Sequence, residues 1–160
     1  MTEKKQEKEW TGPLPFSIYK GIGGKQGAIR FKLVKSKRKK RVAHFVLLEA
    51  AKTIGKNKYD WDNVIVFALN QNDLGGLLYA LENEASFESF HDPHKGSENQ
   101  GKISKSLKLT PAEGRKGVFF LNLMHKEASK DVRVGLAINT ADVQILKTLL
   151  KHALIKMFDW

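Results

Sequence analysis

The chain has 160 residues, of which 28 are Lys or Arg and 17 are Asp or Glu, giving a formal net charge of +11. This length suits one domain with a sizeable core, and a hydrophobic content of 41% excludes intrinsic disorder. The absence of cysteine excludes disulfides, thiolate catalysis and cysteine-ligated zinc, and the lack of an 18-residue apolar run predicts no membrane span.

The first residues are polar and mixed in charge. They predict a flexible N-terminal tail at 1–13, followed by a single folded domain at 14–160. They do not have the apolar stretch of a signal peptide. We therefore expect a cytoplasmic or nucleoid-associated protein in a bacterial or phage-type setting, or an organellar one if a transit peptide has been removed.

Alternation of apolar and polar residues predicts the first strands. After a short strand at 15–21 and a glycine-rich turn, residues 28–35 place Ile29 and Phe31 on one face and Arg30 and Lys32 on the other. This pattern is typical of a half-buried strand with a basic outer face. Two more strands are predicted at 41–51 and 56–69, and the charged tip of a hairpin lies between 36 and 40.

The hydrophobic period then changes from two residues to three or four. Leucines at 74, 77, 78 and 81 predict a short helix with Asn70 as its N-cap. Four further strands are predicted at 85–91, 101–109, 116–125 and 131–138. A longer amphipathic helix follows, capped by Thr140. Strands and helices in this order predict an α+β fold with antiparallel sheets.

The positive charge is concentrated at the start of the chain. Residues 1–58 hold 16 Lys or Arg against 4 Asp or Glu, whereas residues 59–160 hold 12 against 13. This asymmetry favours a face that meets a polyanion such as nucleic acid. A solvated, solubilising surface is the alternative.

Two histidines and an aspartate, His91, Asp92 and His94, lie within four positions and raise the question of a metal or catalytic site. Zinc needs three or four converging ligands, and Pro93 stiffens the chain between these three. We expect instead a strand end and turn in which Asp92 accepts backbone N–H groups. No complete catalytic constellation is present, so we expect no enzyme, no metal and no cofactor.

Several segments in a fixed order resemble the Whirly family of single-stranded DNA-binding proteins. They are "SIYKG", "KYDW" followed by "VFAL", "SFESFHDPHKGSENQGKISKSLKL" and "GVFFLNL", with a C-terminal helix that closes on tryptophan. The resemblance runs from about residue 16 to 160. It implies two antiparallel four-stranded sheets packed across each other, with two helices that assemble a four-fold symmetric homotetramer.

We therefore expect a non-enzymatic, sequence-tolerant single-stranded DNA-binding protein that acts in replication, recombination or repair. In such a protein lysines hold phosphates and aromatic rings stack on bases. An RNA-binding or annealing factor on the same fold, and a transcription cofactor or scaffold, are the alternatives. No membrane partner is expected.

The expected nucleic-acid contacts are basic, polar or aromatic residues of the predicted strands and turns, and we expect roughly half of the rings to be buried. They are Tyr19, Lys20, Lys25, Arg30, Phe31, Lys32, Lys37, Arg38, Lys39, Lys40, Arg41, Tyr59, Trp61, Phe87, Phe90, Asn99, Lys102, Ser104, Lys105 and Lys108. The expected subunit contacts lie on the last helix, at Leu146, Leu149, Leu150, Ala153 and Phe158. Phe119 and Phe120 are assigned to the core or to subunit contacts.

Overall fold

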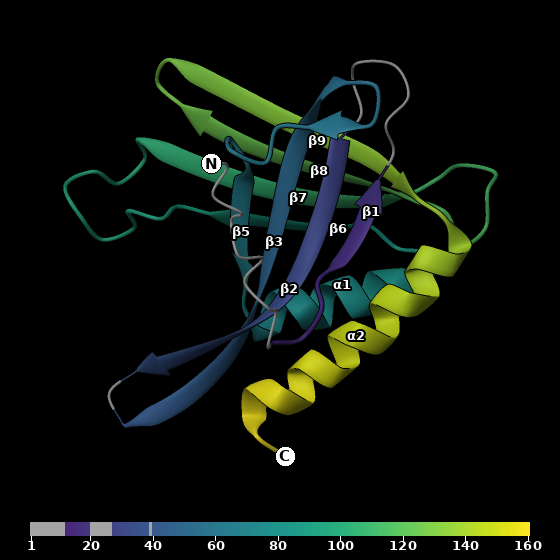
Figure 1. Ribbon diagram of the computed structural model, residues 1–160, viewed down its shortest axis with the longest axis horizontal. Coiled ribbons are helices and arrows are strands. Elements are labelled where there is room, and N and C mark those ends of the chain that lie inside the picture. The colour runs from purple at the N-terminus through teal and green to yellow at the C-terminus, as the bar shows by residue number, and fades with distance from the viewer. Residues whose placement is uncertain (1–11, 20–26, 39) are drawn as a thin grey trace, which may run out of the picture.

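The computed structural model describes residues 12–19, 27–38 and 40–160 (Figure 1). In chain order the elements are β1 Phe16–Tyr19, β2 Gly27–Arg38, β3 Arg41–Gly55, β4 Lys58–Tyr59, β5 Ile65–Leu69, α1 Gln71–Asn83, β6 Phe87–His91, β7 Ile103–Pro111, β8 Phe119–Glu127, β9 Lys130–Ile138 and α2 Thr140–Phe158. Lys20, Lys25 and Lys39, which were expected to bind nucleic acid, lie outside the described residues, as does the side chain of Arg38.

Two antiparallel sheets form the body of the molecule. The first sheet pairs β1, β2 and β3 in that order, with β5 and the short β4 also on β3. The second sheet has the order β6-β7-β8-β9. The strands of one sheet cross those of the other, and both helices lie at one end (Figure 1). The prediction of two antiparallel sheets with two helices is confirmed, and β4 adds a fifth strand to the first sheet.

The core lies between the inner faces of the two sheets and the helices. The predicted alternation in β2 is present, because Ile29 and Phe31 are buried while Arg30 and Lys32 are partly exposed. Each buried side chain of this size contributes roughly 1.5–3 kcal/mol to folding. The largest fully buried side chains are Phe67, Phe119, Ile29, Leu48, Ile65, Leu69, Leu74, Leu107, Leu109, Leu121, Leu123 and Ile138.

Both helices begin with an asparagine cap. Asn70 Oδ1 accepts the backbone N–H of Asp73, and Asp73 accepts that of Asn70, which confirms the predicted cap of α1. For α2 the prediction of Thr140 was wrong. Asn139 has the extended backbone of a cap and accepts the N–H of Asp142 at 2.9 Å, so Thr140 is already the first helical residue.

The apolar stripe of α2 divides between the core and the surface. Leu146, Leu150 and Ala153 are no more than 3% exposed, because they pack on the chain's own first sheet. The expectation that these three make subunit contacts is therefore wrong. Leu149 and Phe158 are 43% and 48% exposed and stay available for such contacts. Among the described residues, no helix is long and apolar enough to cross a membrane.

Candidate nucleic-acid interface

Three aromatic rings meet on the outer face of the first sheet. Tyr19 ends β1, Tyr59 ends β4, and Trp61 follows in the next turn. The ring centroids are 5.4 Å apart for Tyr19 and Tyr59 and 6.4 Å apart for Tyr59 and Trp61. Tyr19 is 54% exposed. Tyr59 and Trp61 are half-buried. We call Tyr19, Tyr59 and Trp61 the ring cluster, and the ring surface that it leaves exposed can stack with bases.

Charged side chains hold the ring cluster in place from β2 and β3. The guanidinium carbon of Arg30 lies 3.8 Å from the ring centroid of Trp61, in cation–π geometry. Arg30 Nη1 is also 3.7 Å from Glu49 Oε2, and Lys32 Nζ is 2.9 Å from Glu49 Oε1. Since one carboxylate faces two cations, this face keeps a net positive charge while its side chains are ordered.

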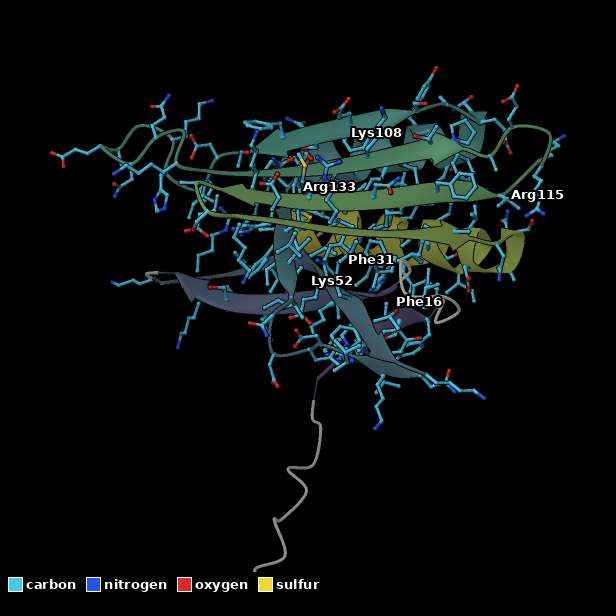
Figure 2. All side chains as sticks on the ribbon, turned by 90° about the horizontal axis from the view of Figure 1, so that it is seen from above. Phe16, Phe31, Lys52, Lys108, Arg115 and Arg133 are labelled. Atoms are coloured by element: carbon cyan, nitrogen blue, oxygen red, sulfur yellow. The ribbon has the colours of Figure 1, made fainter. Side chains whose placement is uncertain are left out.

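The outer face of the second sheet carries a different set of groups. Phe90, Ser106, Met124 and Arg133 form one row across its four strands. Lys108 lies on the same outer face, one row along. Phe90 is 66% exposed. In Figure 2 the labelled Lys108 and Arg133 lie at the second sheet, whereas Phe31 lies between it and the first. Cations and flat or flexible apolar groups therefore share this face.

The segment with two histidines is a structural turn. Asp92 accepts the backbone N–H groups of His94 and Gly101, each at 2.8 Å, which confirms the predicted role of Asp92. His91 turns inward, and its ring stacks on Phe67 at 4.1 Å. Within the described ranges, no group of three or more His, Cys, Asp or Glu is arranged to hold a metal.

A buried carboxylate joins this turn to α1. Asp73 is 4% exposed and accepts the hydroxyl of Ser89 at 2.6 Å. Its other oxygen lies 3.0 Å from Nε2 of His91. Because Ser89 and His91 both contact the aspartate rather than each other, the trio is not in the order of a catalytic triad. It fastens β6 to the N-terminus of α1.

Three residues that were expected to contact nucleic acid point into the molecule, so these three expectations are wrong. Phe31 is 6% exposed and stacks on Phe16. Phe87 packs against the core, and a Cβ at Gly76 of α1 would collide with its ring. Lys105 donates to the carbonyl of Val66 at 2.9 Å, and burial lowers the pKa of its amine. Phe31 and Lys105 share strand parity with buried residues, and Phe87 pairs with the buried Leu109.

The other expected residues are spread over the surface. Lys102 is exposed and donates to Asn99 Oδ1 at 2.8 Å within the β6–β7 loop. Ser104 is half-buried in β7, and the exposed cations of the β2–β3 hairpin lie apart from both sheets' faces. The structure thus brings together the ring cluster, Arg30 and Lys32, and it does not place the remaining candidates in the same site.

The sequence reasoning missed part of the second sheet's outer face. Phe120 was assigned to the core or to subunit contacts but is 46% exposed on that face, and Asn122, Lys126 and Arg133 are exposed farther along the same face. Alternation in the segment 119–125 carries the signal, because residues 119, 121 and 123 are buried and the even positions between them point outward.

Comparisons with known proteins show which family the chain resembles. A family model described as Whirly transcription factor matches residues 25–149. The chain is 33% identical over 117 residues to the chloroplastic single-stranded DNA-binding protein WHY1 of Arabidopsis thaliana, covering 72% of this chain and 44% of that protein. It is 31% identical over 108 residues to the mitochondrial WHY2 of the same plant, covering 67% and 45%. The chain therefore spans less than half the length of these relatives.

Solved structures show the same fold. The crystal structure of WHY3 from Arabidopsis thaliana superposes with a TM-score of 0.77 at 29% identity, covering 92% of this chain and 90% of that one. A guide-RNA-binding protein complex bound to guide RNA gives a TM-score of 0.61 at 14% identity, which shows a likeness of fold alone.

The curated relatives also correct the expected cellular setting. Their names place them in chloroplasts or mitochondria, so the expectation of a cytoplasmic or nucleoid-associated protein in a bacterial or phage-type setting is wrong. That expectation rested on the polar, mixed-charge composition of the first residues, which does not identify a cellular compartment. With the family model over most of its length and the crystal structure of WHY3 superposing on 92% of it, the chain belongs to the Whirly family.

Proposed function

We propose that this chain binds single-stranded DNA on the outer faces of its two sheets. The observation that carries the proposal is the ring cluster, in which the exposed Tyr19 and the half-buried Tyr59 and Trp61 lie beside Arg30 on an open sheet face. Stacking on aromatic side chains contributes about 1–3 kcal/mol per base and works for every base, so binding of this kind tolerates any sequence. The relatives named as single-stranded DNA-binding proteins support this reading.

Positive charge contributes to binding by attracting the phosphate backbone, in addition to base stacking. A net charge of +11 attracts any polyanion, and Lys108 and Arg133 lie exposed where a sugar–phosphate backbone would cross the second sheet. Bound in this way, the protein performs no catalysis. It covers exposed strands during replication, recombination or repair.

Titration of fluorescent oligonucleotides at two salt concentrations tests the proposal. We expect tight binding to single strands of mixed sequence, weak binding to blunt duplex and a clear fall in affinity with salt. A matched RNA strand in the same assay separates DNA binding from RNA binding. Equal affinity for strand and duplex, or an affinity independent of salt, would contradict the proposal.

The same proposal includes assembly as a homotetramer through α2, with DNA passing between protomers. Leu149 is exposed on that helix while Leu150, next to it, is buried in the chain's own core. Leu149→Asp should therefore dissociate the tetramer without unfolding the protomer, and should weaken binding to long strands more than to short ones. Light scattering measures the mass, and a wild type that is already monomeric at micromolar concentration contradicts the assembly.

A further inference from the structure

Strands β2 and β3 continue together beyond the rest of the first sheet. In the described chain, β1 pairs with residues 28–31 of β2, and β5 pairs with residues 46–50 of β3. From Val34↔Phe45 to Arg38↔Arg41 the two strands pair with each other alone. We call residues 34–38 and 40–45 the arm. Its five residue pairs, at roughly 3.4 Å each, extend about 17 Å from the sheet, and both views show it projecting (Figures 1 and 2).

The arm carries the highest density of positive charge in the chain. Six of the seven residues from 35 to 41 are Lys or Arg, and no Asp or Glu occurs between Glu9 and Glu49. The side chains of Lys37, Lys40 and Arg41 are exposed. No acid of the described residues forms an ion pair with these three. The arm therefore carries positive charge that no ion pair neutralises, on a hairpin only two strands wide.

The two faces of the arm both carry cations. Lys35 and Lys37 share the parity of the buried Ile29 and Phe31, whereas Arg41 has the parity of the opposite face. A strand of DNA lying on one face would leave the cations of the other face without a phosphate. Binding that uses both faces needs a ligand with phosphates on two sides of the arm.

The charged end of the arm also differs from the sheet faces, because its only aromatic ring systems, His44 and Phe45, lie at its base where it leaves the sheet. Residues 35–43 include no aromatic side chain, so the arm has no stacking surface for unpaired bases. A B-form duplex presents rows of phosphates on both sides of its major groove. That groove is about 12 Å wide and admits a two-stranded β-ribbon, whereas the major groove of duplex RNA is too narrow.

We infer that the arm enters the major groove of a B-form duplex next to the bound single strand. The sheet faces hold the unpaired strand, the arm holds the adjoining paired segment, and the ligand is a junction between the two. This inference rests on the proposed single-strand binding and adds its substrate class.

Anisotropy titrations with three DNAs test the inference: a single strand, the same strand with a short duplex at one end, and the duplex alone. We expect the wild type to bind the junction about tenfold more tightly than the single strand and with a steeper salt dependence, since each phosphate contact on B-DNA adds about 0.9 to the slope. In the variant Lys37→Ala/Lys40→Ala/Arg41→Ala, the junction advantage should disappear while single-strand affinity changes little.

A matched variant removes the same number and type of charges elsewhere. Arg115→Ala/Lys116→Ala/Lys130→Ala also replaces one exposed Arg and two exposed Lys, in the β7–β8 turn and at the start of β9. It should retain the junction advantage. If both variants lower the affinity for junction and single strand by the same factor, the arm contributes only general charge and the inference is overturned.

The remaining outcomes separate this inference from the proposed function. Single-strand binding without any junction advantage overturns the inference and leaves the proposed function standing. Absence of single-strand binding overturns the proposed function itself. If the arm variant has a different mass by light scattering, the arm is a contact between copies of the chain, which also overturns the inference.

Directed cleavage locates the arm on the DNA. Because the chain has no cysteine, Ser36→Cys gives a single attachment point for an iron chelate that cuts nearby DNA. Cuts should fall within the duplex, beside the junction. The control is Ser86→Cys. Two residues before Ser86, Glu84 accepts the backbone N–H of Gly117 in the β7–β8 turn. Arg115 of the same turn lies at the far end of the molecule from the arm (Figure 2). Cuts from Ser36→Cys that are confined to the single strand overturn the inference.

Discussion

The outer faces of the two sheets offer nucleic acid different chemistry. On the first sheet, Arg30 and Lys32 both contact Glu49, and the rings of the ring cluster touch one another. On the second sheet, no acid of the described residues forms an ion pair with Lys108 or Arg133. The first face is ordered and suited to stacking, whereas the second is a looser cationic surface. Base stacking and salt dependence should therefore be separable by mutation.

Removing the open rings of the first face should have the largest effect. Tyr19→Ala/Tyr59→Ala deletes two stacking surfaces, each worth about 1–3 kcal/mol, so affinity for single strands should fall by roughly a hundredfold or more. The slope of affinity against salt should stay the same, because no charge is lost. Anisotropy titration at several salt concentrations measures both quantities.

Tyr79→Ala is the matched control, since Tyr79 is 64% exposed on α1 and away from both sheets' outer faces. It should bind like the wild type. If the double variant loses no more affinity than Tyr79→Ala, the ring cluster is not a stacking site and the contrast between the faces disappears.

The contrast also requires the two sheets to keep their relative positions, and Asp73 joins them. Asp73→Ala removes the partner of Asn70 N–H, Ser89 and His91. Leaving these three partly buried hydrogen bonds unmade should lower the free energy of unfolding by about 2–4 kcal/mol. Chemical denaturation followed by circular dichroism measures this change.

The second helix provides the comparison for Asp73. Asp142 occupies the equivalent position after an asparagine cap, but no carboxylate contact to a strand is present there within the described residues. Asp142→Ala should therefore lower the free energy of unfolding by under about 1 kcal/mol, through the helix dipole alone. Equal losses for the two variants would show that Asp73 acts only as a helix cap.

Two lysines of β7 test whether the outer face of the second sheet contacts the phosphates of DNA. Lys108 points outward and is exposed, whereas Lys105 points inward to the carbonyl of Val66. Lys108→Met should weaken single-strand binding a few-fold and reduce the salt slope by about 0.7, the value for one phosphate contact on a single strand. Lys105→Met should leave both unchanged. The reverse ranking would place the DNA between the sheets and not on their outer faces.

The smallest effect concerns pH. Burial lowers the pKa of Lys105 below its ordinary value, so the folded chain disfavours the charged amine. Between the folded and unfolded pKa values the unfolded chain binds more protons, and stability therefore rises with pH through that alkaline window. Lys105→Met should flatten this rise. Urea denaturation across the window measures it, and an unchanged pH dependence would show that the amine is well solvated.

Local sequence patterns were sufficient to predict most of the helices and strands and some of the side-chain roles. Alternation predicted most strands, but the single strand expected at 56–69 is wrong, because a turn at 60–64 separates β4 from β5. The spacing of leucines predicted α1, and Asn70 and Asp92 have the roles that their residue types favour. The same parity argument would have excluded Phe31 and Lys105, because Ile29 and Leu107 lie two residues away on the buried face. Phe31 and Lys105 were expected to bind nucleic acid because of their residue types. The two-residue alternation of the strand, which places both on the buried face, was not applied to them.

Other features depended on the tertiary structure. Tyr19 and Tyr59 are distant in sequence and meet because β1 pairs with β2 while β4 pairs with the end of β3. The burial of Leu150 beside the exposed Leu149 depends on where the first sheet ends against α2. Sequence by itself determined which residues share a face of an element, since backbone geometry fixes that period. Only packing decided which face is covered and which distant residues touch, because those outcomes depend on how the elements bury one another's surface.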